Sequence, residues 1–238
     1  MTFQITVQPS GHHYDCDADE TVLAAAIRSG IGLPYGCKNG ACGSCKGKVV
    51  EGTIHHRPHQ ARALSEQEKL QGFALMCCAV PEGDVVIEAR EVGGSTDYPV
   101  RKMPTRVIAI RRAALDVAIL TLQLPANEAL AYRAGQYIEF MLKDGKRRAY
   151  SIASAPSLGG PIELHIRHLP GGVFTDHVFS TMKERDILRF EGPLGTFFLR
   201  EESDKPIVFV ASGTGFVPIK AVIEHALHKG IKQQMTLY

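Results

Sequence analysis

Pro34-Tyr35-Gly36-Cys37-Lys38-Asn39-Gly40-Ala41-Cys42-Gly43-Ser44-Cys45 is the stretch that decides the fold of the first part of this chain. Its cysteines stand in the spacing C-x4-C-x2-C, and a fourth cysteine, Cys77, follows later in the sequence. The three glycines let the backbone turn sharply, so a single loop can aim several thiolates and its own N–H groups at one point. The stretch therefore predicts a loop that wraps a small metal centre.

The spacing is that of a plant-type 2Fe-2S centre, in which four thiolates hold two irons. The predicted metal ligands are Cys37, Cys42, Cys45 and Cys77. Zinc is the competing interpretation, but structural zinc sites usually combine paired C-x2-C elements. The adjacent Cys78 stays open as an alternative to Cys77.

Other residues of metal-binding type receive ordinary interpretations. Cys16 is interpreted as a small buried side chain. His55, His56 and His59 have the wrong spacing relative to the cysteines for a mixed His and Cys site, and a solvated loop is predicted for them.

Composition excludes several classes of protein. The chain has 238 residues, 45% hydrophobic content and a formal charge of +2, which suits about two domains and provides no basic footprint for nucleic acid. No stretch approaches the roughly 18 apolar residues of a membrane span. Residues 1–7 alternate like a strand and do not resemble a signal peptide, so we expect a cytoplasmic protein with reduced thiols.

Periodicity divides the chain into successive domains. In the first part, a helix over residues 21–30, with Asp19 as its cap and Gly30 as its left-handed end, is expected beside several strands. These elements predict a small β-grasp domain. The expected strands are 1–7, 14–17, 46–50 and 85–89, and a second short helix is expected at 65–71.

The second part changes to repeated β-type runs separated by Gly and Pro turns, which favours an antiparallel barrel. One helix, residues 175–183, interrupts these runs, and a βαβ unit begins near residue 206. The predicted boundaries are a ferredoxin-type domain at 1–92, a linker at 93–102, a β-barrel domain at 103–203 and the start of an α/β domain at 204–238.

The quoted loop, together with Leu75-Met-Cys-Cys78, resembles the cluster segments of plant-type ferredoxins. A hydride donor cannot feed a one-electron cluster directly, so a flavin is chemically required between them. Arg148-Ala-Tyr150-Ser151 resembles the R-x-Y-[ST] motif of the ferredoxin-NADP reductase superfamily. The resemblance implies that Arg148 neutralises a flavin phosphate, Tyr150 packs on the isoalloxazine and Ser151 hydrogen-bonds near N5. Tyr150 and Ser151 are therefore the predicted catalytic residues.

Two further segments resemble the same superfamily. His165-Ile166-Arg167, followed by Gly171-Gly172-Val173-Phe174-Thr175, resembles the second flavin segment, where a helix N-terminus faces the pyrophosphate. Ser212-Gly213-Thr214-Gly215-Phe216-Val217-Pro218 resembles the nucleotide loop. The resemblance implies that the cofactor-binding residues are Arg148, Tyr150, Ser151, Ile166, Arg167, Gly172, Val173, Thr175, Gly213, Thr214, Gly215 and Pro218.

Members of this superfamily continue beyond the strand that corresponds to residues 235–238, so we expect the nucleotide domain here to be incomplete and its hydride-donor site with it. Across its length the chain is most similar to the reductases known as CDP-6-deoxy-Δ3,4-glucoseen reductases. This resemblance implies electron flow from NAD(P)H through FAD to a 2Fe-2S cluster and then to a dehydrase. A reductase component of an aromatic-ring oxygenase or phenol hydroxylase, and a non-enzymatic electron-carrier fragment, are the alternatives. Neither a nucleic acid nor a membrane is expected as a partner.

Overall fold

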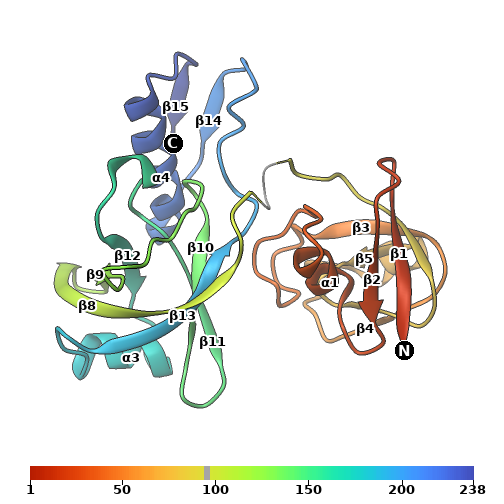
Figure 1. The fold of residues 1–238 in the computed structure, drawn as a ribbon, viewed down its shortest axis with the longest axis horizontal. Coiled ribbons are helices and arrows are strands. Elements are labelled where there is room, and N and C mark those ends of the chain that lie inside the picture. The colour runs from red at the N-terminus through yellow and green to blue at the C-terminus, as the bar shows by residue number, and fades with distance from the viewer. Residues whose placement is uncertain (94–96) are drawn as a thin grey trace. The chain divides into compact units, whose positions relative to one another are not determined.

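The computed structural model describes residues 1–93 and 97–238 and divides into two compact units, Met1–Asp97 and Tyr98–Tyr238 (Figure 1). Residues 94–96 of the predicted linker lie outside the described residues. The last two residues of that linker, Arg101 and Lys102, already belong to strand β8, because they pair with strand β13. No helix in the described part of the chain is long and apolar enough to cross a membrane.

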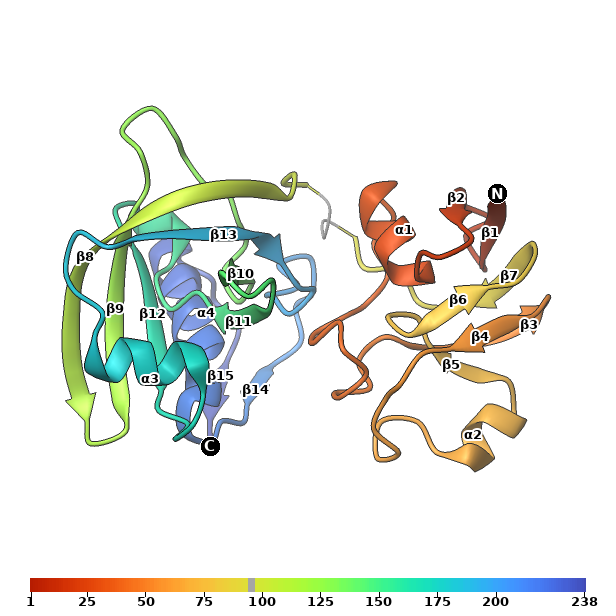
Figure 2. The ribbon, with the colours of Figure 1, turned by 90° about the horizontal axis from the view of Figure 1, so that it is seen from below.

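A mixed sheet forms the first unit, and its strand order is β2-β1-β7-β3-β5 in the described residues. β1 and β7 run parallel, while the other neighbours run antiparallel. Helix α1 lies against β2 and β6 (Figure 2). The bounds are β1 Thr2–Gln8, β2 His13–Asp17, α1 Val22–Arg28, β3 Lys46–Glu51, β4 Ile54–His56, α2 Glu66–Leu70, β5 Phe73–Leu75, β6 Ala79–Pro81 and β7 Val85–Glu88.

Two local predictions for this unit were wrong. Asp19 does not cap α1; Thr21 does, and its Oγ1 accepts a hydrogen bond from the Ala24 N–H at 3.2 Å. The histidine segment is not simply a loop, because His55 and His56 belong to β4, which pairs with β6. The predicted end of α1 is confirmed, since Gly30 has a φ of +74° directly after the cap residue.

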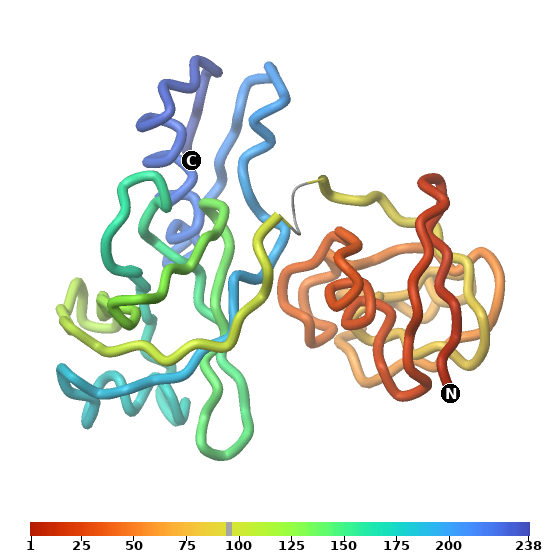
Figure 3. The backbone as a smooth tube through the Cα atoms, viewed as in Figure 1, coloured from red at the N-terminus to blue at the C-terminus, as the bar shows by residue number. Residues whose placement is uncertain are grey.

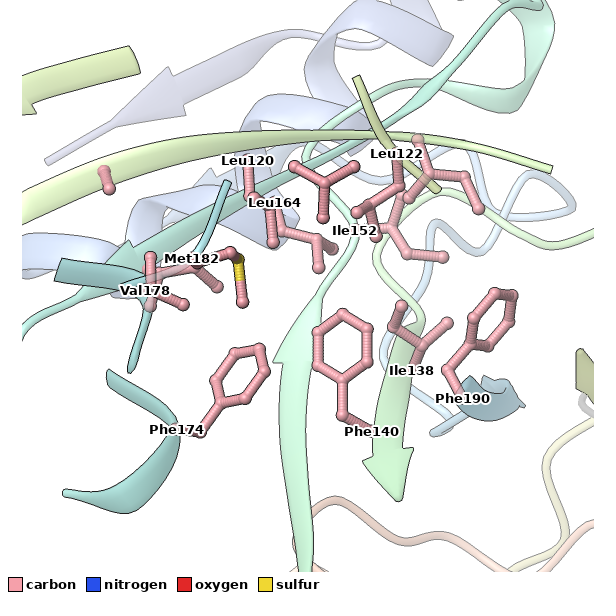
Figure 4. Packing of buried hydrophobic residues seen from close by; sticks show 14 of the residues in the cluster. Leu120, Leu122, Ile138, Phe140, Ile152, Leu164, Phe174, Val178, Met182 and Phe190 are labelled. Carbon is pink, nitrogen blue, oxygen red and sulfur yellow. The ribbon is translucent and has the colours of Figure 1, made fainter. Parts of the chain in front are cut away.

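An antiparallel sheet with the order β11-β10-β13-β8-β9-β12 forms most of the second unit in its described residues. Its two edge strands meet at an isolated bridge between Ile152 and Leu164, which closes the sheet around an apolar core. Figure 4 shows Phe140, Phe174 and Phe190 in this core together with the aliphatic side chains. The bounds are β8 Arg101–Ala114, β9 Val117–Gln123, β10 Tyr137–Met141, β11 Arg147–Ser151, β12 Ile162–Arg167, α3 Val173–Ser180 and β13 Ile187–Leu194.

The remainder of the second unit is a βαβ segment with two parallel strands. Strand β14 (Ile207–Phe209) leads through a single helical turn into α4 (Phe216–Lys229), and β15 (Met235–Leu237) follows. A left-handed Gly230, with a φ of +69°, ends α4. The prediction that this α/β domain is incomplete stays a prediction.

Candidate redox sites

Pairing of β3 with β5 brings Cys45, one predicted ligand of the cluster loop, to the predicted ligand Cys77. Cys37, Cys42 and Cys45 lie in the loop between α1 and β3, which Figure 3 traces, and Cys77 lies in the turn between β5 and β6. Lys46 stands opposite Leu75 in the sheet register, and the Met76 N–H donates to the Cys45 carbonyl at 3.0 Å. Cys45 and Cys77 therefore meet at the end of one strand pair, although 32 positions separate them in the sequence.

Left-handed backbone lets the cluster loop direct N–H groups at sulfur. The φ angles of Lys38, Gly40 and Gly43 are +57°, +73° and +80°. The N–H groups of Ala41 and Cys42 point to Cys37 Sγ at 3.4 and 3.3 Å, and the Gly40 N–H donates to Cys77. Such donors stabilise negative charge on ligand sulfurs, which is one of the factors that set a cluster's reduction potential.

The lowered pKa values of Cys42 and Cys77 also suit metal ligands. Burial raises the pKa of Cys42, but hydrogen bonds with the Ser44 side chain and N–H outweigh it and lower the pKa to about 7. A hydrogen bond from Cys45 lowers the pKa of Cys77 to about 6, and the same contact with burial raises the pKa of Cys45. Metal binding requires thiolates, so iron would displace the thiol protons of this pair.

The thiols fall into two pairs, since Cys42 also exchanges a hydrogen bond with Cys37. Within residues 1–93 and 97–238, no three His, Cys, Asp or Glu side chains converge on one point as the ligands of a single metal ion do. A two-iron centre needs only two of its four protein ligands on each iron. The arrangement therefore fits a 2Fe-2S cluster.

The other sulfur and histidine groups occupy distinct positions. Cys16 is fully buried in β2, as predicted. Cys78 is also buried, and its Sγ lies 3.7 Å from Cys77 Sγ. The rings of His56 and His59 lie 5.8 Å apart, beside the cluster loop.

The predicted flavin residues lie on β11 and the segment that follows it. Arg148 and Tyr150 are two positions apart on β11, so their side chains project from the same face of the strand. The Tyr150 ring lies 5.3 Å from Phe174 and 6.0 Å from Phe140, and burial raises the pKa of its hydroxyl to about 12. These contacts fix the tyrosine ring and leave it half-buried, which suits an aromatic platform. Ser151, also half-buried, ends the strand.

The second flavin segment divides into core residues and accessible ones. Ile166 is fully buried in the core, so only its backbone could meet a ligand. The exposed Arg167 places its Nε 3.0 Å from Asp116 Oδ2. Thr175 does not offer a free hydroxyl, as its Oγ1 donates to the Leu169 carbonyl at 2.8 Å.

Gly172 and Val173 open α3 beside a groove. Gly172 is the residue that precedes the first helical turn, and a Cβ there would lie 2.6 Å from Thr175 Oγ1. Val173 is 57% exposed and lines a groove of about 920 Å³ together with Lys143 and His177. The free N–H groups at the start of a helix, next to basic side chains, are suited to a phosphate.

The predicted nucleotide loop follows β14 in the chain and lies against β12. Gly213, Thr214 and Gly215 form a single helical turn before α4, and Pro218 lies in the first turn of that helix. A Cβ on Gly213 would lie 3.7 Å from Arg167 Nη1. The structure therefore brings the predicted nucleotide loop next to the predicted flavin segment.

Lys220 is a site residue that no sequence motif indicated. From α4, its Nζ donates to the Ala153 carbonyl at 3.1 Å and lies 3.4 Å from Glu163 and 2.9 Å from Glu224. Ala153 follows Ser151 by two residues. This lysine therefore ties the helix of the nucleotide loop to the end of the flavin strand. Only its i,i+4 spacing to Glu224 is visible in the sequence.

Comparison with known proteins identifies the type of each domain. Residues 5–82 match the 2Fe-2S iron-sulfur cluster binding domain, and residues 104–199 match the oxidoreductase FAD-binding domain. The chain is 37% identical to the CDP-6-deoxy-L-threo-D-glycero-4-hexulose-3-dehydrase reductase of Yersinia pseudotuberculosis, over 100% of this chain and 71% of that protein. It is 34% identical to the aromatic O-demethylase reductase subunit of Amycolatopsis, over 100% of this chain and 72% of that protein. The crystal structure of the Amycolatopsis cytochrome P450 reductase GcoB superimposes with a TM-score of 0.83 at 34% identity, over 100% of this chain and 72% of that one.

Fold and sites together define an iron-sulfur flavoprotein reductase, an enzyme of electron transfer. The chain belongs to the family of reductases that join a 2Fe-2S domain to an FAD-binding domain. In this family electrons pass from NAD(P)H to FAD and then to the 2Fe-2S cluster, and reductase components of this kind serve a partner oxygenase or dehydrase.

Proposed function

We propose that this reductase delivers single electrons to a partner dehydrase that acts on a CDP-linked deoxysugar. The observation that carries the proposal is the 37% identity over the whole chain to a reductase named for such a dehydrase. Bound FAD would accept the two electrons of a hydride and release them one at a time, which a one-electron centre requires.

Residue roles follow from the two sites. Cys37, Cys42, Cys45 and Cys77 hold the cluster, in the two pairs described above. Arg148 neutralises a flavin phosphate, Tyr150 supports the isoalloxazine with its ring backed by Phe174, and Ser151 donates a hydrogen bond near N5.

The N-terminal ends of α3 and α4 bind the phosphates of the flavin and of the nicotinamide nucleotide. Gly172 and Val173 at the start of α3 offer free N–H groups to the flavin pyrophosphate, beside the groove. The turn from Gly213 to Gly215 meets the nicotinamide nucleotide, and Pro218 supports the first turn of α4 behind it. The guanidinium of Arg167, a residue of the predicted flavin segment, lies near Gly213 of this turn. Thr175 shapes the turn at residues 169–172.

A second candidate is the reductase component of an aromatic oxygenase. It is favoured by the 34% identity to an aromatic O-demethylase reductase subunit and to a cytochrome P450 reductase structure. Both candidates use the same internal electron path, so only the acceptor distinguishes them. Mixing the reduced protein with purified dehydrase and oxygenase components, and following reoxidation of the cluster absorbance, would separate the two.

The cytoplasm is the proposed location, because six free thiols stay reduced in that compartment.

A Cys42→Ser variant tests the electron path. It should lose iron and acid-labile sulfide but retain FAD, because Cys42 lies in the first unit and the flavin residues in the second. In a version extended to the full length of the relatives, with NADH as donor, ferricyanide reduction should persist and cytochrome c reduction should fall strongly. Cys16→Ser is the matched control, since Cys16 is a buried thiol of β2 outside the cluster loop. Unchanged cytochrome c reduction in Cys42→Ser would overturn the proposed order of electron transfer.

A further inference from the structure

Cys78 is a buried thiol in contact with a proposed cluster ligand, and no role has yet been assigned to it. Its side chain is 3% exposed, and its Sγ lies 3.7 Å from both Cys77 Sγ and the Pro58 carbonyl oxygen. We propose that Cys78 is a positioning residue whose thiol donates a weak hydrogen bond to Cys77 and raises the reduction potential of the 2Fe-2S centre. This inference rests on the proposed role of Cys77 as a ligand.

The backbone holds the Cys78 thiol in place. The Cys78 N–H donates to the Leu75 carbonyl at 2.7 Å, and its own carbonyl accepts from the Arg57 N–H at 2.8 Å. Both partners lie in neighbouring parts of the unit, before β6 and directly after β4. These two hydrogen bonds fix the backbone of Cys78, and with it the direction of its Cα–Cβ bond, without the cluster.

Close packing fixes the other side of the thiol. A Cβ on Gly40 would lie 2.8 Å from Cys78 Sγ and 2.7 Å from His59 Cβ, so the sulfur sits directly against the backbone of the cluster loop. The Gly40 carbonyl in turn accepts from the Gln60 N–H at 3.0 Å. Cys78 thus lies between the proposed ligand sulfur of Cys77 and Gly40, whose N–H also donates to that sulfur.

The direction of the effect follows from the charges of the two acceptors. The Cys78 thiol can donate one hydrogen bond, and both the Pro58 carbonyl and the sulfur of the proposed ligand Cys77 lie 3.7 Å from its Sγ. A hydrogen bond to an ionised acceptor is roughly twice as strong as one between neutral groups, so the thiolate is the preferred acceptor. Adding an electron to the centre makes its sulfurs more negative and strengthens this bond. The bond therefore favours the reduced centre, as hydrogen bonds to sulfur do in iron-sulfur proteins.

The alternative role for Cys78 is that of the fourth ligand itself. The structure favours Cys77 for that role, because Cys77 and not Cys78 shares a hydrogen bond with Cys45. A donor role and a ligand role make opposite predictions for removal of the thiol, because only a ligand is needed to retain iron.

The test compares Cys78→Ala, Cys78→Val and Cys78→Ser in the full chain loaded with its cluster, with Cys16→Ala as the control. Cys16 is also buried, and its thiol also lies 3.7 Å from backbone carbonyls, but on β2. The measurements are iron and sulfide content and a redox titration of the cluster followed by electron paramagnetic resonance. This readout needs neither NADH nor the flavin.

We expect all four variants to retain the cluster. Cys78→Ala and Cys78→Val should both shift its potential to more negative values, by about 30 mV, which is about threefold in the ratio of reduced to oxidised centre. Cys78→Ser keeps a donor and should stay close to the unmodified protein, as should Cys16→Ala. If the potentials of Cys78→Ala and Cys78→Val agree although the two side chains differ in volume, the shift comes from the lost hydrogen bond and not from a change in packing.

Two results would overturn the inference. Loss of the cluster in Cys78→Ala and Cys78→Val, with retention in Cys16→Ala, would make Cys78 a ligand. An intact cluster with an unchanged potential in both variants would show that the thiol does not tune the centre. Absence of a 2Fe-2S cluster from the unmodified protein would instead refute the proposed function.

Discussion

Replacing Gly40 by alanine should destabilise the cluster loop more than the same replacement at Gly30. The two glycines have almost the same left-handed backbone, with φ of +73° and +74°. Around Gly30 nothing lies within 4 Å of an added Cβ, whereas at Gly40 the Cβ would lie 2.7 Å from His59 Cβ and 2.9 Å from His59 Cα. The pair therefore separates backbone strain from close packing.

The expected losses of stability follow from backbone strain and from close packing. A left-handed conformation costs an L-residue about 1–2 kcal/mol, and this cost applies to both variants. Overpacking adds about 1–3 kcal/mol at Gly40, because His59 meets the Cβ with its backbone and cannot simply rotate away. Gly40→Ala should therefore cost about 2–5 kcal/mol and Gly30→Ala about 1–2 kcal/mol.

Cluster absorbance and far-ultraviolet circular dichroism, both recorded during urea unfolding, are the appropriate assays. Gly40→Ala should lose its cluster at clearly lower urea concentration than Gly30→Ala, and it should be purified with less iron. Equal unfolding midpoints and equal iron content for the two variants would refute the argument, since they would show that the approach of residue 59 to Gly40 imposes no constraint.

Two further predictions concern ion pairs. In a version extended to the full length of the relatives, Lys220→Met should slow flavin reduction by NADH about tenfold in stopped-flow measurements, because a charged hydrogen bond is worth about 1.5 kcal/mol. Lys229→Met removes an ion pair at the far end of α4 and should not slow it, so equal rates in the two variants would refute the role of Lys220 in joining α4 to the flavin strand. Hydrogen bonds from Lys46 and then from Ser65 lower the pKa of Glu68 from 4.5 to about 2, so the stability they add is complete above pH 4.5 and is lost as the pH falls toward 2. Unfolding midpoints between pH 2 and 6 should depend less on pH in Glu68→Gln, and identical profiles would refute this assignment.

Local sequence was sufficient where a single segment contains all the information. Residues 34–45 carry three predicted ligands and glycines with left-handed backbone, so a 2Fe-2S centre could be predicted from spacing alone. The end of α1 at Gly30 is equally local, because only glycine enters the left-handed region without cost. The short strands β5 and β6 were missed, since three residues are too few to show a period.

Other features depend on partners that are distant in the sequence. Thr21 caps α1 in place of Asp19, although both residue types are good caps. The hydroxyl of Thr175 is used by Leu169 in its own turn, a contact that the motif does not reveal.

The sequence by itself determined the class of protein, the identity of the cluster loop and the order of the flavin and nucleotide segments along the chain. Tertiary structure decided which groups meet. Pairing of β3 with β5 brings Cys45 to Cys77, closure of the second sheet places Ala153 beside Glu163, and α4 then brings Lys220 to both. Spacing along the chain reports contacts only within a turn or a strand, while contacts between distant segments depend on sheet register and helix packing, which no short motif records.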